Sequence, residues 1–268
     1  MLRAILHSKS GKFEDIGGVP SNIAAILRNR EDARTSTIFE RLAYLPPDLM
    51  WKILCRATGG HILPRFQVVK LDSVEFWPTW KLSSDGRSRA EPDVFLRWRL
   101  GDPETMVDMI IEAKRSGEGV TQNRRQWLDQ LFAYEETYLF HETEGEASAR
   151  NGRAKSLVYL CVDGLGEKPT QAIESFEEAE LPVSLPDLTI AGCSWQTIAD
   201  AIGDMEKGEE FGIASKHLLL DIKDALRFCG QIYFHVRIDF SELPPPKFYV
   251  ETLKHLDDLS FGFSRGDL

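Results

Sequence analysis

Three segments in the first half of the chain show the alternation of hydrophobic and polar residues that predicts β-strands. They are 66–77 (FQVVKLDSVEFW), 93–99 (DVFLRWR) and 106–114 (MVDMIIEAK), all rich in β-branched and aromatic residues. A Gly-Asp-Pro-Glu sequence at 101–104 predicts a turn between the second and third segments. The pattern therefore predicts an antiparallel meander on which helices pack.

Two helices are predicted before this meander. The first covers 36–45 (STIFERLAYL) and is expected to end at Pro46-Pro47, because proline interrupts a helix. Asp48 is then expected to cap a second helix over 49–57.

A longer helix and a buried strand are predicted after the meander. Between Trp127 and Tyr138, four large residues follow each other at steps of four, three and four, which makes 121–140 a helix with an apolar stripe. The apolar run 156–162 (SLVYLCV), ended by Asp163, predicts a central strand. The remaining predicted elements are a helix at 22–30, a strand at 188–193, helices at 195–206 and 214–228, a strand at 231–238 and a peripheral arm after 244–246.

The charges and apolar residues of the second and third strands fit one register. Folding the chain about 101–104 pairs Arg97 with Asp108, an oppositely charged cross-strand pair. The apolar pairs in this register are Val94–Ile111, Leu96–Met109 and Trp98–Val107 on one face and Phe95–Ile110 on the other. A slip of one residue would destroy both patterns, so this register is favoured.

The same register gathers two carboxylates and an amine at the open end of the hairpin. Asp93 lies opposite Glu112, Glu91 lies opposite Lys114, and Lys114 projects from the same face as Glu112. Opposed residues have β-carbons about 5 Å apart, and oxygen pairs this close bind hard divalent cations such as Mg²⁺. Lys114 could orient or deprotonate the attacking water, or balance charge on a phosphate. Such a site suits attack of water on a phosphodiester.

These residues also resemble a known signature. Glu-Pro-Asp at 91–93, followed nineteen residues after the aspartate by Glu-Ala-Lys at 112–114, resembles the PD-(D/E)XK motif of restriction-endonuclease-like nucleases. Of three Pro-Asp dipeptides in the chain, only this one precedes the single ExK sequence at hairpin distance. Gln-Leu-Phe-Ala-Tyr at 130–134 is similar to the QxxxY element of the RecB-like branch of that family.

The resemblance implies a role for each residue of the motif. Asp93, Glu112 and the backbone carbonyl of Ala113 would bind Mg²⁺ or Mn²⁺, and Lys114 would be catalytic. Glu40, in the first helix, corresponds to a glutamate that supplies a further metal contact in many members. A solvated glutamate paired with a neighbouring arginine explains Glu40 equally well.

Further residues are candidates for supporting the reaction or positioning the substrate. Gln130 is assigned to the catalytic set, and Tyr134 to substrate positioning, although a tyrosine in this stripe also suits the core. Contacts to phosphate are expected from Arg115, Arg124 and Arg125, with a solvated helix start as the alternative. Trp77 and Trp80 could stack on bases or belong to the core.

The fold class that follows is α/β, with a restriction-endonuclease-like core: a mixed central sheet flanked by helices in the order αβββαβ. The core is assigned to 35–193. Residues 1–34 form an N-terminal extension, and 194–268 form a mainly helical C-terminal appendage packed on the core.

Composition limits the choice of partners. The 268 residues carry 32 basic and 42 acidic side chains, a net charge of −10, which disfavours a protein that coats nucleic acid through a general basic surface. Window 87–125 holds eight basic and seven acidic residues, so an anionic partner is expected there. The four cysteines form no CxxC pair and the six histidines no HExxH spacing, which argues against a zinc site.

The sequence therefore predicts a Mg²⁺- or Mn²⁺-dependent phosphodiester hydrolase, with DNA favoured over RNA as substrate and with bacterial defence or DNA processing as its context. The alternative is a non-catalytic module of the same fold that docks on a protein partner subunit; a homodimer is left open. The short, early polar N-terminus and the lack of a long apolar run lead us to expect a cytoplasmic protein without membrane contact.

Overall fold

The computed structural model describes residues 12–14, 20–22, 31–82, 88–115, 121–139, 154–165, 173–174, 181–208 and 211–229. All of them belong to one compact unit, Met1–Tyr233. Its helices are α3 (Glu31–Ala43), α4 (Pro47–Ala57), α5 (Arg124–Tyr138), α7 (Trp195–Gly208) and α8 (Ile213–Phe228). Its strands are β1 (Lys12–Glu14), β2 (Pro20–Asn22), β3 (Val69–Phe76), β4 (Trp80–Leu82), β5 (Ser88–Ala90), β6 (Val94–Leu100), β7 (Thr105–Ala113), β8 (Ser156–Val162) and β9 (Asp187–Cys193).

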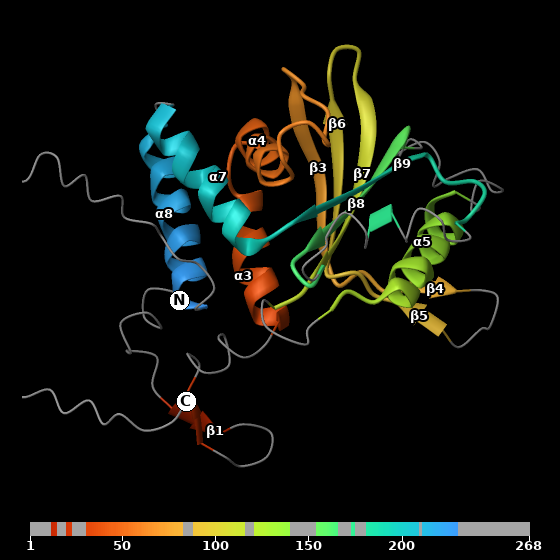
Figure 1. Cartoon of the computed structure of the whole chain (residues 1–268), viewed down its shortest axis with the longest axis horizontal. Helices are drawn as coiled ribbons and strands as arrows, with labels where there is room; N and C mark the ends of the chain where they lie inside the picture. The colour runs from red at the N-terminus through yellow and green to blue at the C-terminus, as the bar shows by residue number, and fades with distance from the viewer. Residues whose placement is uncertain are drawn as a thin grey trace, which may run out of the picture. The chain divides into compact units, whose positions relative to one another are not determined.

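A five-stranded mixed sheet forms the centre of this unit, in the order β3-β6-β7-β8-β9 (Figure 1). Strands β3, β6 and β7 pair antiparallel, whereas β7, β8 and β9 pair parallel. Helices α3 and α4 lie on one side of the sheet and α5 on the other (Figure 1). The predicted α/β class, a mixed central sheet flanked by helices, is confirmed.

The predicted register of the β6–β7 hairpin is also confirmed. Arg97 pairs with Asp108, and the apolar pairs are those expected from the sequence. The turn between the strands begins at Gly101, whose φ of +81° is a left-handed conformation that side chains disfavour. A β-carbon there would also approach the Phe66 ring to 3.2 Å, so both the backbone and the packing favour glycine.

Aromatic side chains pack on both faces of the sheet. On the α4 side, Trp51 and Trp98 meet edge to face with their ring centroids 5.1 Å apart. On the α5 side, Trp80 packs in the same way against Phe95 at 5.4 Å and against Tyr134 at 6.0 Å. Each of these buried side chains contributes about 1.5–3 kcal/mol of hydrophobic stabilisation. Trp80 is therefore a core residue rather than a base-stacking one.

The structure corrects several details of the prediction. Helix α3 begins at Glu31, five residues before the expected start. Asp48 does not cap α4: Pro46 is the capping residue, no side chain supplies a capping bond, and Pro47 starts the first turn. The β4–β5 hairpin was not predicted. Except for Asn22, which ends β2, the expected helix at 22–30 lies outside the described residues, as do the strand at 231–238 and the terminal arm.

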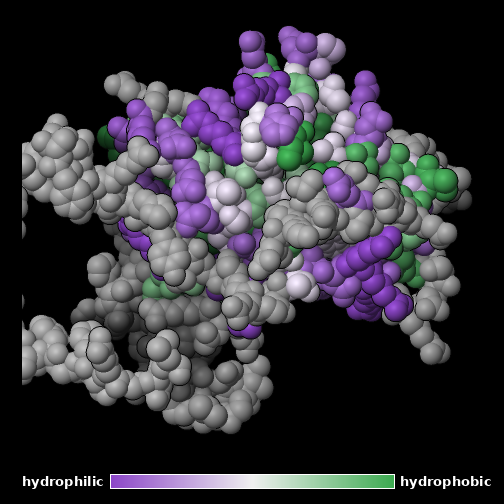
Figure 2. All heavy atoms as spheres, viewed as in Figure 1, coloured by the Kyte–Doolittle hydropathy of each residue, from purple (hydrophilic) through white to green (hydrophobic). Residues whose placement is uncertain are grey.

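The C-terminal helices pack on the first two helices, α7 against α4 and α8 against α3. Hydrophilic residues cover much of the described surface on the face in Figure 2, and hydrophobic residues gather at the right of that view. Exposed hydrophobic residues include Val183 and Phe132. Among the described helices, none has the length and apolarity needed to cross a bilayer. The four cysteines are free thiols.

Candidate functional site

The open end of the β6–β7 hairpin brings two buried carboxylates together. Asp93 directly precedes β6, and Glu112 is the next-to-last residue of β7. The Asp93 carboxylate accepts a hydrogen bond of 2.7 Å from the backbone N–H of Ala113. The two acidic residues are only 8% and 1% exposed. The strand ends thus hold two acidic groups side by side, largely shielded from water.

Helix α5 fixes the Glu112 carboxylate from above the sheet. Its Gln130 side chain donates to Oε2 of Glu112 at 2.8 Å, and Gln126 donates to Oε1 at 2.9 Å. The Tyr159 hydroxyl, from β8, donates to Oε1 of Gln130, which fixes the orientation of that amide. Because these donors are neutral, they orient Glu112 without cancelling its charge. The predicted supporting position of Gln130 is consistent with this geometry.

Lys114 follows β7 and points its ammonium group at carboxylates. Its Nζ pairs with Oε1 of Glu112 and lies 3.4 Å from Oε1 of Glu31, the first residue of α3. Gly164 packs on its stem, since a β-carbon there would lie 3.0 Å from Cβ and Cγ of Lys114. The indole N–H of Trp195 donates to the Lys114 carbonyl at 2.9 Å. Side chain and backbone of Lys114 are therefore both held.

These residues line a pocket of about 560 Å³. Its lining residues are Glu31, Asp32, Trp77, Glu91, Asp93, Glu112, Lys114 and Gln126. Five carboxylates and one ammonium group thus line the pocket, an excess of negative charge that attracts cations and repels a bare phosphate. A phosphodiester would need bound cations to enter.

The pKa values reflect this crowding. Burial, and then the charge of Glu112, raise the pKa of Asp93 to about 7. Burial likewise raises the pKa of Glu112, although Lys114 and Gln130 oppose the shift. Burial alone would lower the pKa of Lys114, but Glu112 and Glu31 outweigh it and the net shift is upward. Lys114 therefore stays protonated. The two carboxylates repel each other, and binding of a further cation would reduce this repulsion.

The structure does not bring Glu40 to this cluster. Glu40 lies nine residues after Glu31 on α3, about 13.5 Å further along the helix axis. It is exposed, accepts a hydrogen bond of 3.1 Å from the Tyr44 hydroxyl and lines a different pocket. The geometry therefore does not support the expected metal contact from Glu40, and Glu31 is the α3 residue that reaches the site.

Tyr134 is also placed differently from its assignment to substrate positioning. It is fully buried between α5 and the sheet and donates a hydrogen bond of 2.8 Å to Asp108. A side chain without exposed surface cannot touch a substrate, so Tyr134 is a core residue in this structure.

Some basic residues of window 87–125 form ion pairs with acidic residues, and others are exposed at the surface. Arg97 is buried against Asp108, and Arg99 pairs with Asp72 and Glu104. By contrast, the side chains of Arg115, Arg124 and Arg125 are exposed. The backbone N–H of Arg115 donates to Glu31 at 2.9 Å, so Arg115 lies beside the site, and its side chain is exposed. These three arginines stay candidates for phosphate contact.

The residues of the site that were not predicted include Glu31, Gln126, Gly164 and Trp195. A signal existed for Glu31, because acidic residues are enriched in the first turn of helices and Glu31-Asp32 precede the apolar periodicity of α3. Gln126 lies one helical turn before Gln130, so the same face of α5 presents both amides. The long-range contacts of Gly164 and Trp195 leave no local pattern in the sequence.

The oxygen atoms of the site fit a small hard cation. Among the described residues, no group of three or more His, Cys, Asp or Glu side chains is arranged to hold a metal ion. Mg²⁺ typically takes one or two carboxylates and keeps several waters, and Asp93 and Glu112 meet that requirement. The hydrogen bond from Ala113 to Asp93 places the backbone of the third implied ligand next to them.

Comparisons with known proteins give little further information. No family model matches the chain, and no solved structure matches it. It is 30% identical over 135 residues to the uncharacterized protein PM0110 of Pasteurella multocida. That alignment covers 50% of this chain and 47% of the relative, so the chain spans about half the length of the curated relative it matches.

Proposed function

We propose that this protein is a metal-dependent nuclease with a restriction-endonuclease-like core, and that it hydrolyses phosphodiester bonds of DNA. The observation that carries the proposal is the pair of buried carboxylates, Asp93 and Glu112, with Lys114 at their side in an open acidic pocket. With α4 and the short β4–β5 hairpin set aside, the order α3, β3, β6, β7, α5, β8 gives further support. So does the antiparallel β3-β6-β7 unit followed by a parallel β8.

The metal would be held by Asp93, Glu112 and the Ala113 carbonyl. When bound, Mg²⁺ or Mn²⁺ supplies Lewis acidity and lowers the pKa of water, as in other metal hydrolases. Gln126 and Gln130 keep the Glu112 carboxylate in one orientation. The Lys114 ammonium stands at the edge of the cluster, where it can balance negative charge that develops on a phosphate. Hydrolysis adds water across the P–O3′ bond and leaves a 5′-phosphate and a 3′-hydroxyl, the products that the family resemblance implies.

Lys114→Ala is the decisive variant. We expect it to lower Mn²⁺-dependent cleavage of labelled single- and double-stranded DNA by about a hundredfold or more, because it removes the cation beside the reacting group. Lys70→Ala is the matched control: Lys70 pairs with Glu104 at the turn end of the same hairpin and is exposed. The cleavage rate of Lys70→Ala should stay close to that of the unmodified protein. The circular dichroism spectra of both variants should match the spectrum of the unmodified protein.

A second reading is a non-catalytic module of the same fold that docks on a basic protein partner. The net charge of −10 and the ion pair between Lys114 and Glu112 favour it. Calorimetric titration with Mn²⁺ separates the two readings. An enzyme should bind the ion and lose this binding in Asp93→Asn and Glu112→Gln, whereas a scaffold should bind no ion at these positions. Unmodified protein that neither binds Mn²⁺ nor cleaves any DNA would refute the nuclease proposal.

A further inference from the structure

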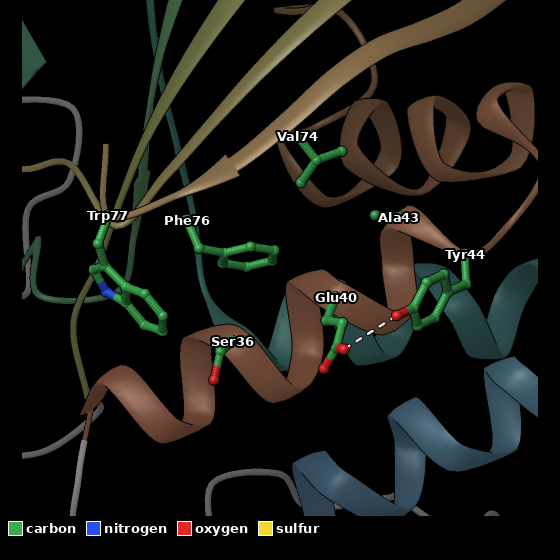
Figure 3. A pocket seen from close by; sticks show the side chains of 7 residues that line it. All are labelled: Ser36, Glu40, Ala43, Tyr44, Val74, Phe76 and Trp77. Atoms are coloured by element: carbon green, nitrogen blue, oxygen red, sulfur yellow. Dashed lines mark hydrogen bonds between the residues drawn. The ribbon is translucent and has the colours of Figure 1, made fainter. Parts of the chain in front are cut away.

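A second pocket, of about 530 Å³, adjoins the acidic one (Figure 3). It lies between α3 and the end of β3, and its lining residues are Ser36, Glu40, Ala43, Tyr44, Val74, Phe76 and Trp77. Trp77 is part of the lining of both pockets, which therefore adjoin at this residue. The two pockets differ in chemistry: the first is acidic, whereas the second is mainly aromatic and aliphatic.

The backbone at the end of β3 produces this arrangement. Val74 and Phe76 are two residues apart and share one face of the strand, toward α3. Trp77 then leaves the strand with a φ of +49°, a left-handed conformation that is a genuine outlier for a bulky residue. Its backbone N–H donates to the carbonyl of Asp93 at 3.2 Å. The strained Trp77 is thus tied directly to a residue of the carboxylate pair. Strain of this kind concentrates at functional sites.

The side chains of the second pocket offer faces for stacking and one acceptor. The rings of Phe76 and Trp77 are 5.8 Å apart and inclined at 48°, and the Tyr44 ring is 65% exposed at the opposite side (Figure 3). Glu40 is the one charged residue of the lining, and its carboxylate faces the Tyr44 hydroxyl. The indole N–H of Trp77 is buried and has no hydrogen-bond acceptor among the described residues.

We propose that this pocket binds an unpaired nucleobase whose adjoining phosphate lies in the acidic pocket, which makes the substrate single-stranded or locally unpaired nucleic acid. The inference rests on the proposed nuclease function. An aromatic residue that lines both an apolar pocket and the acidic pocket suits a nucleotide, because its base is flat and apolar on both faces while its phosphate is charged. A base inside a duplex is stacked on both sides and cannot enter such a pocket without being extruded.

Glu40 gives the pocket a preference among bases. A carboxylate accepts hydrogen bonds and cannot donate them, so it suits bases with an exocyclic amine, as in the recognition of cytosine N4 by Glu and Asp. Thymine presents acceptors at the corresponding positions. Oligo-dC should therefore bind more tightly than oligo-dT.

The test measures binding separately from cleavage. Fluorescence anisotropy of labelled oligo-dC and oligo-dT with the Lys114→Ala protein, in Mn²⁺, gives the dissociation constants without hydrolysis. Tyr44→Ala and Phe76→Ala in this background should each weaken oligo-dC binding by roughly 5- to 150-fold, the range expected for loss of one stacked base. Glu40→Gln should bring the dC and dT constants together. Phe132→Ala, which removes a partly exposed ring from α5, is the matched control and should bind like its parent.

Two outcomes would overturn the inference. One is that Tyr44→Ala and Phe76→Ala bind oligo-dC like the parent; the large exposure of Tyr44 makes loss of folding an unsuitable explanation for any change there. The other is that a blunt duplex binds as tightly as the single strand. If the protein with Lys114 intact still cleaves DNA in either case, the inference alone has failed. If it neither cleaves nor binds nucleic acid, the proposed function has failed with it.

Discussion

The β6–β7 hairpin carries two groups of charged residues on the same face, and they are built in opposite ways. Toward its middle, Arg97 donates two hydrogen bonds of 2.7 Å to Asp108, and the Tyr134 hydroxyl adds a third. The side chains of this pair are 6% and 0% exposed. At the open end, Asp93 and Glu112 lie together beside a pocket, with a lysine that is 14% exposed.

The difference lies in how each group is balanced. Arg97 and Asp108 neutralise each other with matched planar geometry, and no charge is left over for chemistry. At the open end the carboxylates outnumber the cations. Helix α5 serves both groups one turn apart: Tyr134 donates to Asp108, and Gln130 donates to Glu112. On this hairpin, buried charges that neutralise each other stabilise the fold, whereas buried charges that are not neutralised are available for function.

The largest effect on stability is expected where charges cancel. Asp108→Ala leaves the Arg97 charge buried without its partner, and we expect a loss of about 3–5 kcal/mol in the free energy of unfolding. Urea denaturation measures it. Glu104→Ala is the control, since it breaks exposed pairs with Lys70 and Arg99, and should cost under about 1 kcal/mol. Equal costs for the two variants would show that the buried pair is not the structural element we infer.

An intermediate effect is expected from the amide that orients Glu112. Gln130→Ala should weaken Mn²⁺ affinity by about 10–100-fold, the usual effect of removing a partner that orients a metal ligand. Tyr134→Phe is the matched variant one turn along α5, because it removes only the hydrogen bond to Asp108. It should leave Mn²⁺ affinity unchanged. Calorimetric titration of both variants would contradict the distinction if the phenylalanine variant lost affinity to the same extent.

A further effect is the pH dependence of stability in the metal-free protein. Burial, then Glu112, raise the pKa of Asp93 from about 3.9 in an unfolded chain to about 7 when folded. The folded state therefore binds more protons in this range, and raising the pH destabilises it. Relative to Asp93→Asn, the unmodified protein in EDTA should lose stability between about pH 4 and pH 7. Urea denaturation at several pH values tests this, and a constant difference would contradict it.

The sequence predicted the parts of the fold whose pattern is local. The register of the hairpin followed from Arg97, Asp108 and the apolar pairs, because a slip would have exposed a whole apolar face. By contrast, β4 and β5 are three residues each, too short to show an alternation. The start of α3 was placed too late because its first turn is polar and charged, and it carries no apolar period.

The residues of the candidate site also divide into those with a local sequence signal and those without one. Asp93 and Glu112 were predicted to lie together, and the ladder that ends beside them has the expected register. Glu31 contacts Lys114 across 83 positions of sequence, so only the packing of α3 on the sheet could reveal it. Glu40 was selected because it resembles in position the first-helix glutamate of the family, and the late start assigned to α3 left Glu31 outside that helix.

The hydrogen bond from Trp195 to the Lys114 carbonyl bears on where the working unit ends. Trp195 is fully buried, packs edge to face on Phe39 and begins α7, just beyond the boundary at 193 that the sequence suggested for the core. A fragment that ended at residue 193 would lack Trp195. Its loss would leave a cavity beside α3 and would remove the hydrogen-bond donor of the Lys114 carbonyl. The smallest autonomous piece of this chain therefore reaches at least through the helix that carries Trp195.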